Sequence, residues 1–242
     1  IGEEVKNIAA IQRILRSVNL GATAIGTTVT AAPGYPALAV KHLSDITGIE
    51  FTLAEDLIEA TSDTGDYVLL SGVLKHTSAK LTKICNDIRM LASGPRCGLN
   101  ELHLPELQPG SSIMPGKVNP VIPELVNLVA FRVMGNDYTV TLAAHSGQLQ
   151  LNAYEPVEGV AMMESQHLLY TTSNAFRTKC VDGITLNEKV LARYMETTVG
   201  IVTALNPVLG YEKATELAGE AYKSGKGILE VIREKKLLSE AQ

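Results

Sequence analysis

The sequence has little that would suit a membrane or a nucleic acid. Its most apolar stretch, residues 121–134, is interrupted by a proline, a glutamate, an asparagine and an arginine, and no apolar run reaches the roughly 18 residues that a membrane span needs. Lys and Arg total 21 against 26 Asp and Glu, so the formal net charge is −5, and the sequence has no long basic stripe. These absences predict a soluble protein that binds neither membranes nor nucleic acids.

Cysteine is also scarce, with three residues in 242: Cys85, Cys97 and Cys180. An odd number without metal-type spacing argues against both a disulfide framework and a metal centre. The five histidines show no HxxxH or HExxH spacing either, so no metal site is expected. We therefore expect buried free thiols in a reducing compartment, by default the cytoplasm.

A strong helical pattern is present. Hydrophobic residues make up 45% of the chain and charged residues 19%, as in globular proteins with a sizeable core. Between Asp66 and Ala92 a mostly apolar seam repeats at steps of three and four. Its members are Leu70, Leu74, Thr77, Leu81, Ile84, Ile88 and Leu91. This repeat predicts a long helix packed against partner helices in an elongated bundle.

The other elements are predicted to be helical as well. Longer helices are expected over residues 3–20, 37–47, 121–149 and 155–181, and shorter ones over residues 187–196, 199–205, 211–223 and 227–234. Gly21 and Gly48 are expected to end the first two helices, and Asn206-Pro207 is expected to separate two of the short ones. Residues 21–36 indicate an irregular connection, and residues 102–104 suggest a short ribbon.

The predicted fold class is therefore all-α. Residues 1–186 are expected to form an elongated central bundle that carries the loop 108–120, and residues 187–242 a small helical C-terminal domain that is incomplete. Two of the long bundle helices are apolar on more than one face, so we expect a homotetramer. The opening IGEEVKNIAAIQ has neither an initiator Met nor a basic n-region, so we expect a fragment that starts inside a helix.

Reactive groups concentrate in the loop between Ser93 and Pro120, above all in GSSIMPGKVNP at residues 110–120. Loops of this length in compact domains are usually functional. Gly110 and Gly116 permit backbone conformations that turn successive N–H groups into an anion-binding concavity, while the prolines stiffen the turns. Two serines, a lysine and an asparagine within this loop suit the binding of carboxylates. A surface loop with a solvated lysine fits the composition equally well.

GSSIMPGKVNP, followed by VIPE, resembles the signature loop of the aspartase/fumarase superfamily, and the continuation is most similar to its aspartase branch. GATAIGT, LASGPRCGLNEL, GNDYTVTLAAHSGQLQLNAYEP and the block at residues 198–207 are similar to aspartase segments in the same order. The resemblance implies an all-helical homotetramer with composite active sites built from three subunits. It also implies a carbon-nitrogen lyase without cofactor that reversibly deaminates L-aspartate, a small dicarboxylate, to fumarate and ammonia.

The same resemblance implies that Ser111 is the general base, which removes a Cβ proton from the substrate and leaves an enediolate intermediate. A free serine hydroxyl is a weak base, so the alkoxide must be stabilised electrostatically. The backbone N–H groups of Ile113 and Met114 and the ammonium group of Lys117 are the available means.

Further residues of the segment are expected to hold the substrate. By the resemblance, Ser112 donates to the enediolate, while Lys117 and Asn119 anchor a substrate carboxylate, the lysine as a point charge and the asparagine as a directional donor. Glu124 matches a family glutamate that hydrogen-bonds a histidine from an upstream block, which implies a supporting role.

Two alternatives stay open. A fumarate hydratase would use the same carbanion chemistry with water in place of ammonia. A non-catalytic helical oligomer, or an inactive fragment, would keep the fold without the chemistry. The upstream blocks that supply further Thr, Ser and His groups in the family have no counterpart in the 242 residues, so we expect this segment to supply about one of the three parts of an active site.

Overall fold

The computed structural model describes residues 1–235 and residue 237, which form two compact units. The first unit comprises residues 1–89 and 106–183, and the second comprises residues 90–105 together with those from 184 onward. The division at residue 186 that the sequence suggested had left residues 90–105 in the bundle. They group with the second unit because their strand pairs with a strand there.

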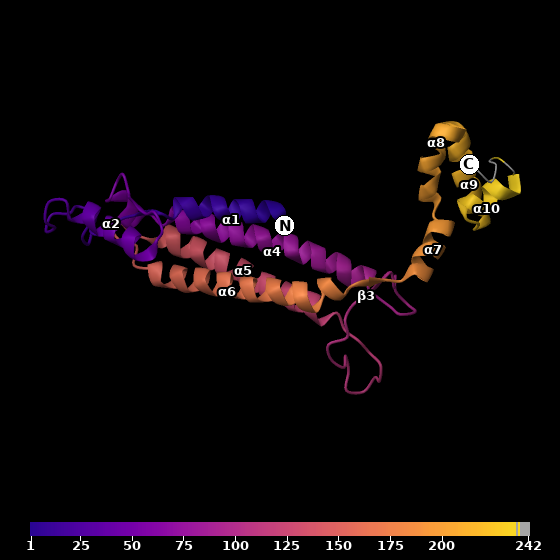
Figure 1. Ribbon diagram of the computed structural model, residues 1–242, viewed down its shortest axis with the longest axis horizontal. Coiled ribbons are helices and arrows are strands. Elements are labelled where there is room, and N and C mark those ends of the chain that lie inside the picture. Colours follow the sequence, from indigo (N-terminus) through magenta and orange to yellow (C-terminus); the bar gives the residue numbers. More distant parts are fainter. Residues whose placement is uncertain (236, 238–242) are drawn as a thin grey trace. The chain divides into compact units, whose positions relative to one another are not determined.

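The first unit holds the long helices, and Figure 1 shows α1, α4, α5 and α6 running alongside one another. Its elements are α1 (Gly2–Ile14), β1 (Ser17–Val18), α2 (Tyr35–Thr47), β2 (Thr52–Leu53), α3 (Glu59–Ser62), α4 (Gly65–Leu91), α5 (Val121–Ser146), α6 (Glu155–Lys179) and the 3-10 helix η1 (Val181–Gly183). The all-α prediction is confirmed, since the strands are two residues long.

Helix α4 confirms the predicted seam. Leu70, Leu74 and Leu81 are buried, together with Cys85 one turn further on. The helix ends at Leu91, one residue before the predicted end. The spacing predicted this helix correctly because apolar residues at steps of three and four lie on one face of a helix, which is the face that becomes buried.

Helix α5 packs against α4 on one side and α6 on another, as its burial pattern requires. Its buried apolar residues include Val126, Val133 and Val140, which follow at exact heptad spacing. Between α4 and α5, Ser71 donates to Asp137 Oδ1 at 2.9 Å and Asn127 Nδ2 donates to Asn86 Oδ1 at 2.8 Å. Because the α5 partner number falls as the α4 number rises, the two helices are antiparallel.

The prediction of one helix over residues 3–20 is wrong. Helix α1 stops at Ile14, and residues 17–18 instead form β1, which pairs in parallel with β2. The backbone oxygen of Arg16 accepts from the Thr52 N–H at 2.9 Å, and that of Val18 accepts from the Ala54 N–H at 3.0 Å. A partner 36 residues away in sequence therefore takes the backbone groups that a longer helix would use.

The irregular connection and the helix after it are confirmed. Helix α2 ends at Gly48, which adopts the left-handed conformation with φ of 68°. Within the connection, Gly26 lies directly on the backbone of another segment: a Cβ there would lie 2.2 Å from the Leu57 oxygen. Only glycine fits this approach, which brings residues 21–31 against the chain entering α3.

The second unit is a small helical cluster. Its elements are β3 (Leu102–His103), β4 (Thr185–Leu186), α7 (Glu188–Thr197), the 3-10 helix η2 (Val199–Ile201), α8 (Val202–Leu209), α9 (Tyr211–Ser224) and α10 (Ile228–Lys235). The suggested ribbon at residues 102–104 is confirmed as β3, which pairs antiparallel with β4. The core consists of Leu217, Ala221, Ile228, Val231 and Ile232.

The expected break at Asn206-Pro207 is not observed. Pro207 lies inside α8, which continues to Leu209 and ends where the Gly210 N–H donates to the Asn206 oxygen at 2.9 Å. Proline removes one backbone donor, and packing of α8 on the core offsets that loss, since Val202, Leu205 and Leu209 contact it.

The cysteines are free, but only two of them fit the expectation of buried thiols. Cys85 and Cys180 are buried, whereas Cys97 is exposed in the connection that follows α4. Burial, with a smaller contribution from Cys180, raises the pKa of the Cys85 thiol to about 12, so this thiol is inert at neutral pH. No helix within residues 1–235 combines the length and apolar character that a bilayer crossing requires.

Candidate functional site

The Ser111 hydroxyl is held by the backbone of its own loop. Its Oγ accepts the N–H of Ile113 at 3.2 Å and the N–H of Met114 at 3.1 Å. Two donors directed at one oxygen favour negative charge on that oxygen. Ser111 is half-buried, so part of the residue remains accessible to solvent.

The ends of the loop are tied together around this serine. The Gly110 N–H donates to the Lys117 oxygen at 2.7 Å, and Asn119 Nδ2 donates to the Gly110 oxygen at 3.0 Å. A Cβ on Gly110 would lie 2.6 Å from the Lys117 oxygen, so the closure requires glycine at this position. Gly116 has φ of 79°, the left-handed conformation expected for it.

A cavity of about 400 Å³ lies beside the loop and is lined by Ser111, Met114 and Lys117. Its other walls are Glu106, Leu107, Gln108, Pro109, Pro115, Gly116 and Val118. The lining includes one lysine, one serine and a single acidic residue, Glu106, around a space large enough for a small dicarboxylate.

The remaining predicted residues are placed unevenly. Ser112 is exposed, and the Ile113 side chain is 84% exposed, so that residue contributes its backbone N–H to the loop. One of the two N–H groups of the Asn119 side-chain amide donates to the backbone oxygen of Gly110. Glu124 lies in the first turn of α5, where its Oε1 is 3.7 Å from Nη2 of Arg89.

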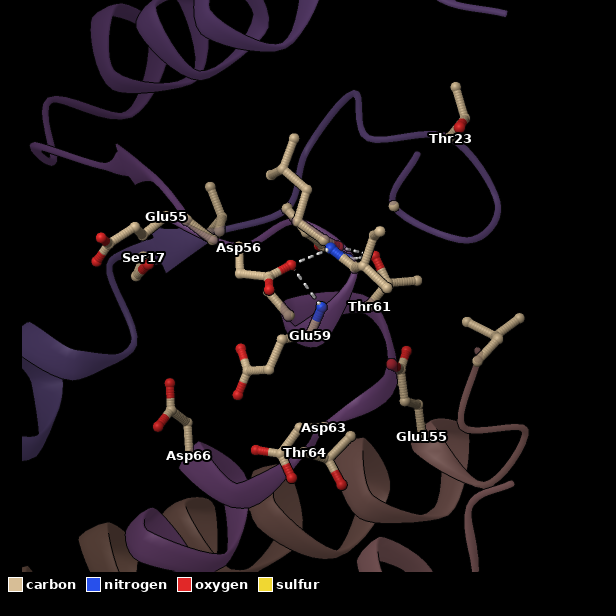
Figure 2. Close-up of a pocket in the computed structure, with 18 of the residues that line it drawn as sticks. Ser17, Thr23, Glu55, Asp56, Glu59, Thr61, Asp63, Thr64, Asp66 and Glu155 are labelled. Atoms are coloured by element: carbon tan, nitrogen blue, oxygen red, sulfur yellow. Dashed lines mark hydrogen bonds between the residues drawn. The ribbon is translucent and has the colours of Figure 1, made fainter. Parts of the chain in front are cut away.

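A larger cavity of about 1170 Å³ lies elsewhere in the first unit (Figure 2). Six carboxylates line it: Glu55, Asp56, Glu59, Asp63, Asp66 and Glu155. Burial, and to a smaller extent the negative charge of Asp63, raise the pKa of Asp66. The cavity therefore repels a dicarboxylate.

Sequence reasoning missed this acidic cavity, although five of its six carboxylates fall within residues 55–66. Their density was the available signal, but only the fold adds Glu155 from the start of α6. Asp56 Oδ1 accepts the N–H groups of Ile58 and Glu59 and so holds the turn into α3. Among the residues that the structure describes, no three His, Cys, Asp or Glu side chains converge as a metal ion requires.

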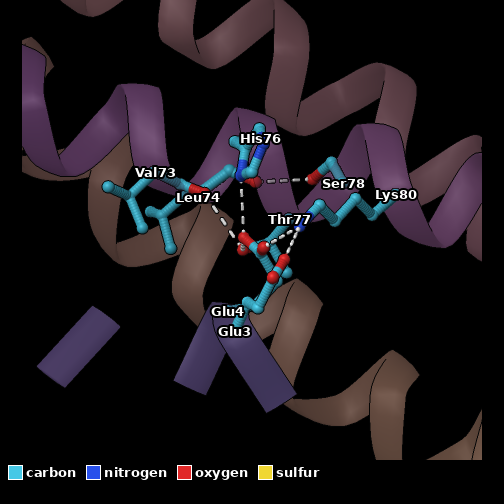
Figure 3. A network of polar contacts seen from close by, with 8 residues as sticks. All are labelled: Glu3, Glu4, Val73, Leu74, His76, Thr77, Ser78 and Lys80. Carbon is cyan, nitrogen blue, oxygen red and sulfur yellow. Dashed lines mark hydrogen bonds and ion pairs between the residues drawn. The ribbon is translucent and has the colours of Figure 1, made fainter. Parts of the chain in front are cut away.

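A third charged cluster joins α1 to α4 (Figure 3). Glu4 is 2% exposed and receives Lys80 Nζ at 2.6 Å, the Thr77 hydroxyl at 3.2 Å and His76 Nδ1 at 2.8 Å. The hydrogen bond from Lys80 and the contact with His76 outweigh burial and lower the pKa of Glu4 to about 2. The carboxylate is saturated with partners, as in a structural ion pair.

The family model described as "Lyase" matches residues 1–135, more than half of the chain, and the model described as "Fumarase C C-terminus" matches residues 201–242. The chain belongs to this lyase family. It is 54% identical over its whole length to the aspartate ammonia-lyase of Pseudomonas aeruginosa and covers 51% of that protein. The resemblance to the aspartase branch is thereby confirmed, and the chain spans about half the length of the curated relatives it matches.

Solved structures agree with the family assignment. The cobalt-bound fumarate lyase:delta crystallin from Brucella melitensis superposes with a TM-score of 0.93 at 48% identity, over 99% of this chain and 52% of that one. The class II fumarase from Schistosoma mansoni superposes with a TM-score of 0.88 at 32% identity, over 98% of this chain and 53% of that one. The lyase fold is therefore shared across relatives with different names.

Proposed function

We propose that the protein to which this chain belongs is an aspartate ammonia-lyase, which converts L-aspartate reversibly to fumarate and ammonia, with Ser111 as the general base. The observation that carries the proposal is the pair of backbone N–H groups, from Ile113 and Met114, that donate to the Ser111 oxygen beside a cavity lined by Lys117. The relatives named aspartate ammonia-lyase at 54% identity support the choice of substrate.

The proposed reaction begins with the Ser111 alkoxide, which takes a proton from Cβ of L-aspartate and becomes the neutral hydroxyl. The electron pair of the broken C–H bond moves into the β-carboxylate and forms an enediolate. When that pair returns to form the Cα–Cβ double bond, the Cα–N bond breaks and the ammonium group leaves as neutral ammonia. Fumarate remains, and no cofactor is needed.

The other groups of the loop stabilise charge along this path. The two backbone donors to Ser111 stabilise its alkoxide, and their geometry is set before the substrate arrives. Lys117, exposed at the cavity, is proposed to neutralise a substrate carboxylate. Asn119 follows the residues that line the cavity, and the second N–H of its side-chain amide is proposed to donate to the same carboxylate. We propose that Ser112, an exposed residue of the same loop, donates to the enediolate and that Glu124, in the first turn of α5, supports the site.

We propose that the complete protein is a homotetramer with composite active sites. Helices α5 and α6 leave large apolar side chains exposed in a way that a partner subunit would cover. These are Leu128, Phe131, Tyr138, Val160, Met163 and Tyr170, each at least 58% exposed. A cytoplasmic location completes the proposal and is supported by three free cysteines.

The test uses the complete purified protein. Fumarate formation is followed by its ultraviolet absorbance with L-aspartate in one sample and L-malate in another. Fumarate from L-aspartate alone supports the proposal, and fumarate from L-malate alone replaces it with a fumarate hydratase. A folded tetramer that is inactive on both overturns the enzyme assignment in favour of a structural oligomer.

A further inference from the structure

The end of α4 and the start of α5 are joined by a small polar cluster, which we call the α4–α5 joint: Asn86, Arg89, Glu124 and Asn127. On each helix the two members are three residues apart and therefore lie on the same face. Asn127 Nδ2 donates to Asn86 Oδ1 at 2.8 Å, and Arg89 Nη2 is 3.7 Å from Glu124 Oε1. The joint lies immediately after the loop 108–120, because α5 begins at Val121.

The joint is the place where the loop is attached to the bundle. The Asn119 side chain closes the loop by donating to the Gly110 oxygen, and the backbone oxygen of Asn119 accepts the Val121 N–H at 2.8 Å. The Glu124 N–H donates to the Pro120 oxygen at 3.1 Å, which forms the first turn of α5. Any displacement of that turn moves Asn119 and, through the closure, the Ser111 loop.

Arg89 is the cation of the joint, and it is incompletely satisfied. Its Nε is buried and has no hydrogen-bond partner within the described residues, and the same holds for Oδ1 of Asn127. A buried donor and a buried acceptor left open in one cluster are costly in a purely structural contact. Oε1 of Glu124 lies 3.7 Å from Nη2 of Arg89, an ion-pair contact longer than a hydrogen bond, between side chains that are 41% and 40% exposed. Among the described residues, Oε2 of Glu124 has no closer partner.

We propose that Arg89 is a positioning residue for the lyase reaction, which acts by fixing the Glu124 carboxylate and with it the first turn of α5 that carries the end of the Ser111 loop. This inference rests on the proposed function and deepens it. Arg89 holds one oxygen of Glu124 and leaves the other for a further donor of the assembled site. It touches neither the substrate nor the reacting atoms.

The experiment measures kcat and KM for L-aspartate in the complete protein, its Arg89→Met and Glu124→Gln variants, and the double variant. Loss of positioning is expected to lower kcat about tenfold or more in Arg89→Met, with KM changed by less than about threefold. Because Arg89 acts through Glu124, the double variant should be no slower than Glu124→Gln alone. Arg89→Lys, which keeps the charge, should recover part of the activity.

The matched control is Arg132→Met, which breaks another ion pair of α5, 2.8 Å to Glu164 on α6, away from the loop. Its kcat should stay within about twofold of the unaltered protein. Melting temperature and oligomeric state are measured for every variant, and if Arg89→Met does not fold, Arg89→Lys and Glu124→Gln carry the test.

The outcomes separate this inference from the proposed function. An unaltered protein without activity on L-aspartate overturns the proposed function, and the inference falls with it. An active protein in which Arg89→Met matches the control, or in which its loss adds fully to that of Glu124→Gln, overturns the inference alone. A fully additive loss would mean that Arg89 contributes independently of Glu124.

Discussion

Two cavities of the first unit differ in size and charge, and the smaller is the better candidate site. The acidic cavity of about 1170 Å³ is lined by six carboxylates, whereas the cavity of about 400 Å³ beside Ser111 has a lysine and one glutamate. The six carboxylates of the first cavity repel a dicarboxylate, whereas the lysine of the second cavity attracts one. Volume alone favours the acidic cavity, whereas charge and oriented donors favour the cavity beside Ser111.

The sharpest test of this comparison is Ser111→Ala in the complete protein. We expect kcat to fall about a thousandfold or more, because the substitution removes the proposed general base. The melting temperature should change by less than about 2 °C, since the loop hydroxyl supports little packing and the N–H groups it accepts belong to exposed residues that water can reach. The matched control is Ser17→Ala in the acidic cavity, which should leave kcat unchanged. A large loss of stability in Ser111→Ala would contradict the assignment.

The second largest effect is expected for Lys117→Ala. Removing the ammonium group takes away a charge-assisted contact with a substrate carboxylate, so KM for L-aspartate should rise roughly tenfold or more while kcat changes less. Steady-state kinetics on the complete protein measure both. An unchanged KM would remove the carboxylate-binding role from Lys117.

A paired carboxylate should respond to pH in the opposite sense from the crowded ones. The pKa of Glu4 is lowered from 4.5 to about 2, so its ionised form stabilises the fold above pH 4.5, and that contribution is lost as the pH falls towards 2. Acid unfolding of Glu4→Gln should therefore show a weaker pH dependence between pH 4.5 and 2. Glu3→Gln, at an exposed partner of Lys80, serves as the control. Equal acid sensitivity of both variants would show that Glu4 is not the group responsible.

The smallest expected effect belongs to Asp66→Asn in the acidic cavity. Burial and the charge of Asp63 raise its pKa, so the ionised carboxylate destabilises the fold at neutral pH, and this penalty is relieved as the pH falls through the pKa and the group is protonated. The neutral amide should raise the melting temperature at pH 7 by about 2 °C or less, with KM for L-aspartate unchanged. A rise or fall in KM would connect the acidic cavity to the substrate and break the comparison.

The long helices were predictable because each buries a continuous stripe. The steps of three and four through Leu70, Leu74 and Leu81 reported α4 almost to the residue. Helix α1 was predicted too long, since the same spacing continued to Val18 while the backbone there pairs with Thr52. Helix α8 was predicted too short, because local proline chemistry yielded to packing on the second unit's core.

The candidate site was likewise predictable in part. Its residue types lie within one short segment, so their composition and order could be recognised before any coordinates. The direction of the Ile113 and Met114 N–H groups towards Ser111, and the closure of Gly110 on Lys117, depend on backbone torsions that composition does not specify. The acidic cavity needed Glu155 beside residues 55–66, a contact across about 90 positions.

The sequence by itself determined the all-helical class, the extent of α4 to within a residue and the segment that carries the reactive groups, because each depends on local spacing or on neighbouring residues. Only the tertiary structure decided where α1 ends, which cavity carries which charge, and that Arg89 faces Glu124. These features depend on pairs of residues far apart in the chain, and their energies appear only when folding brings the partners together.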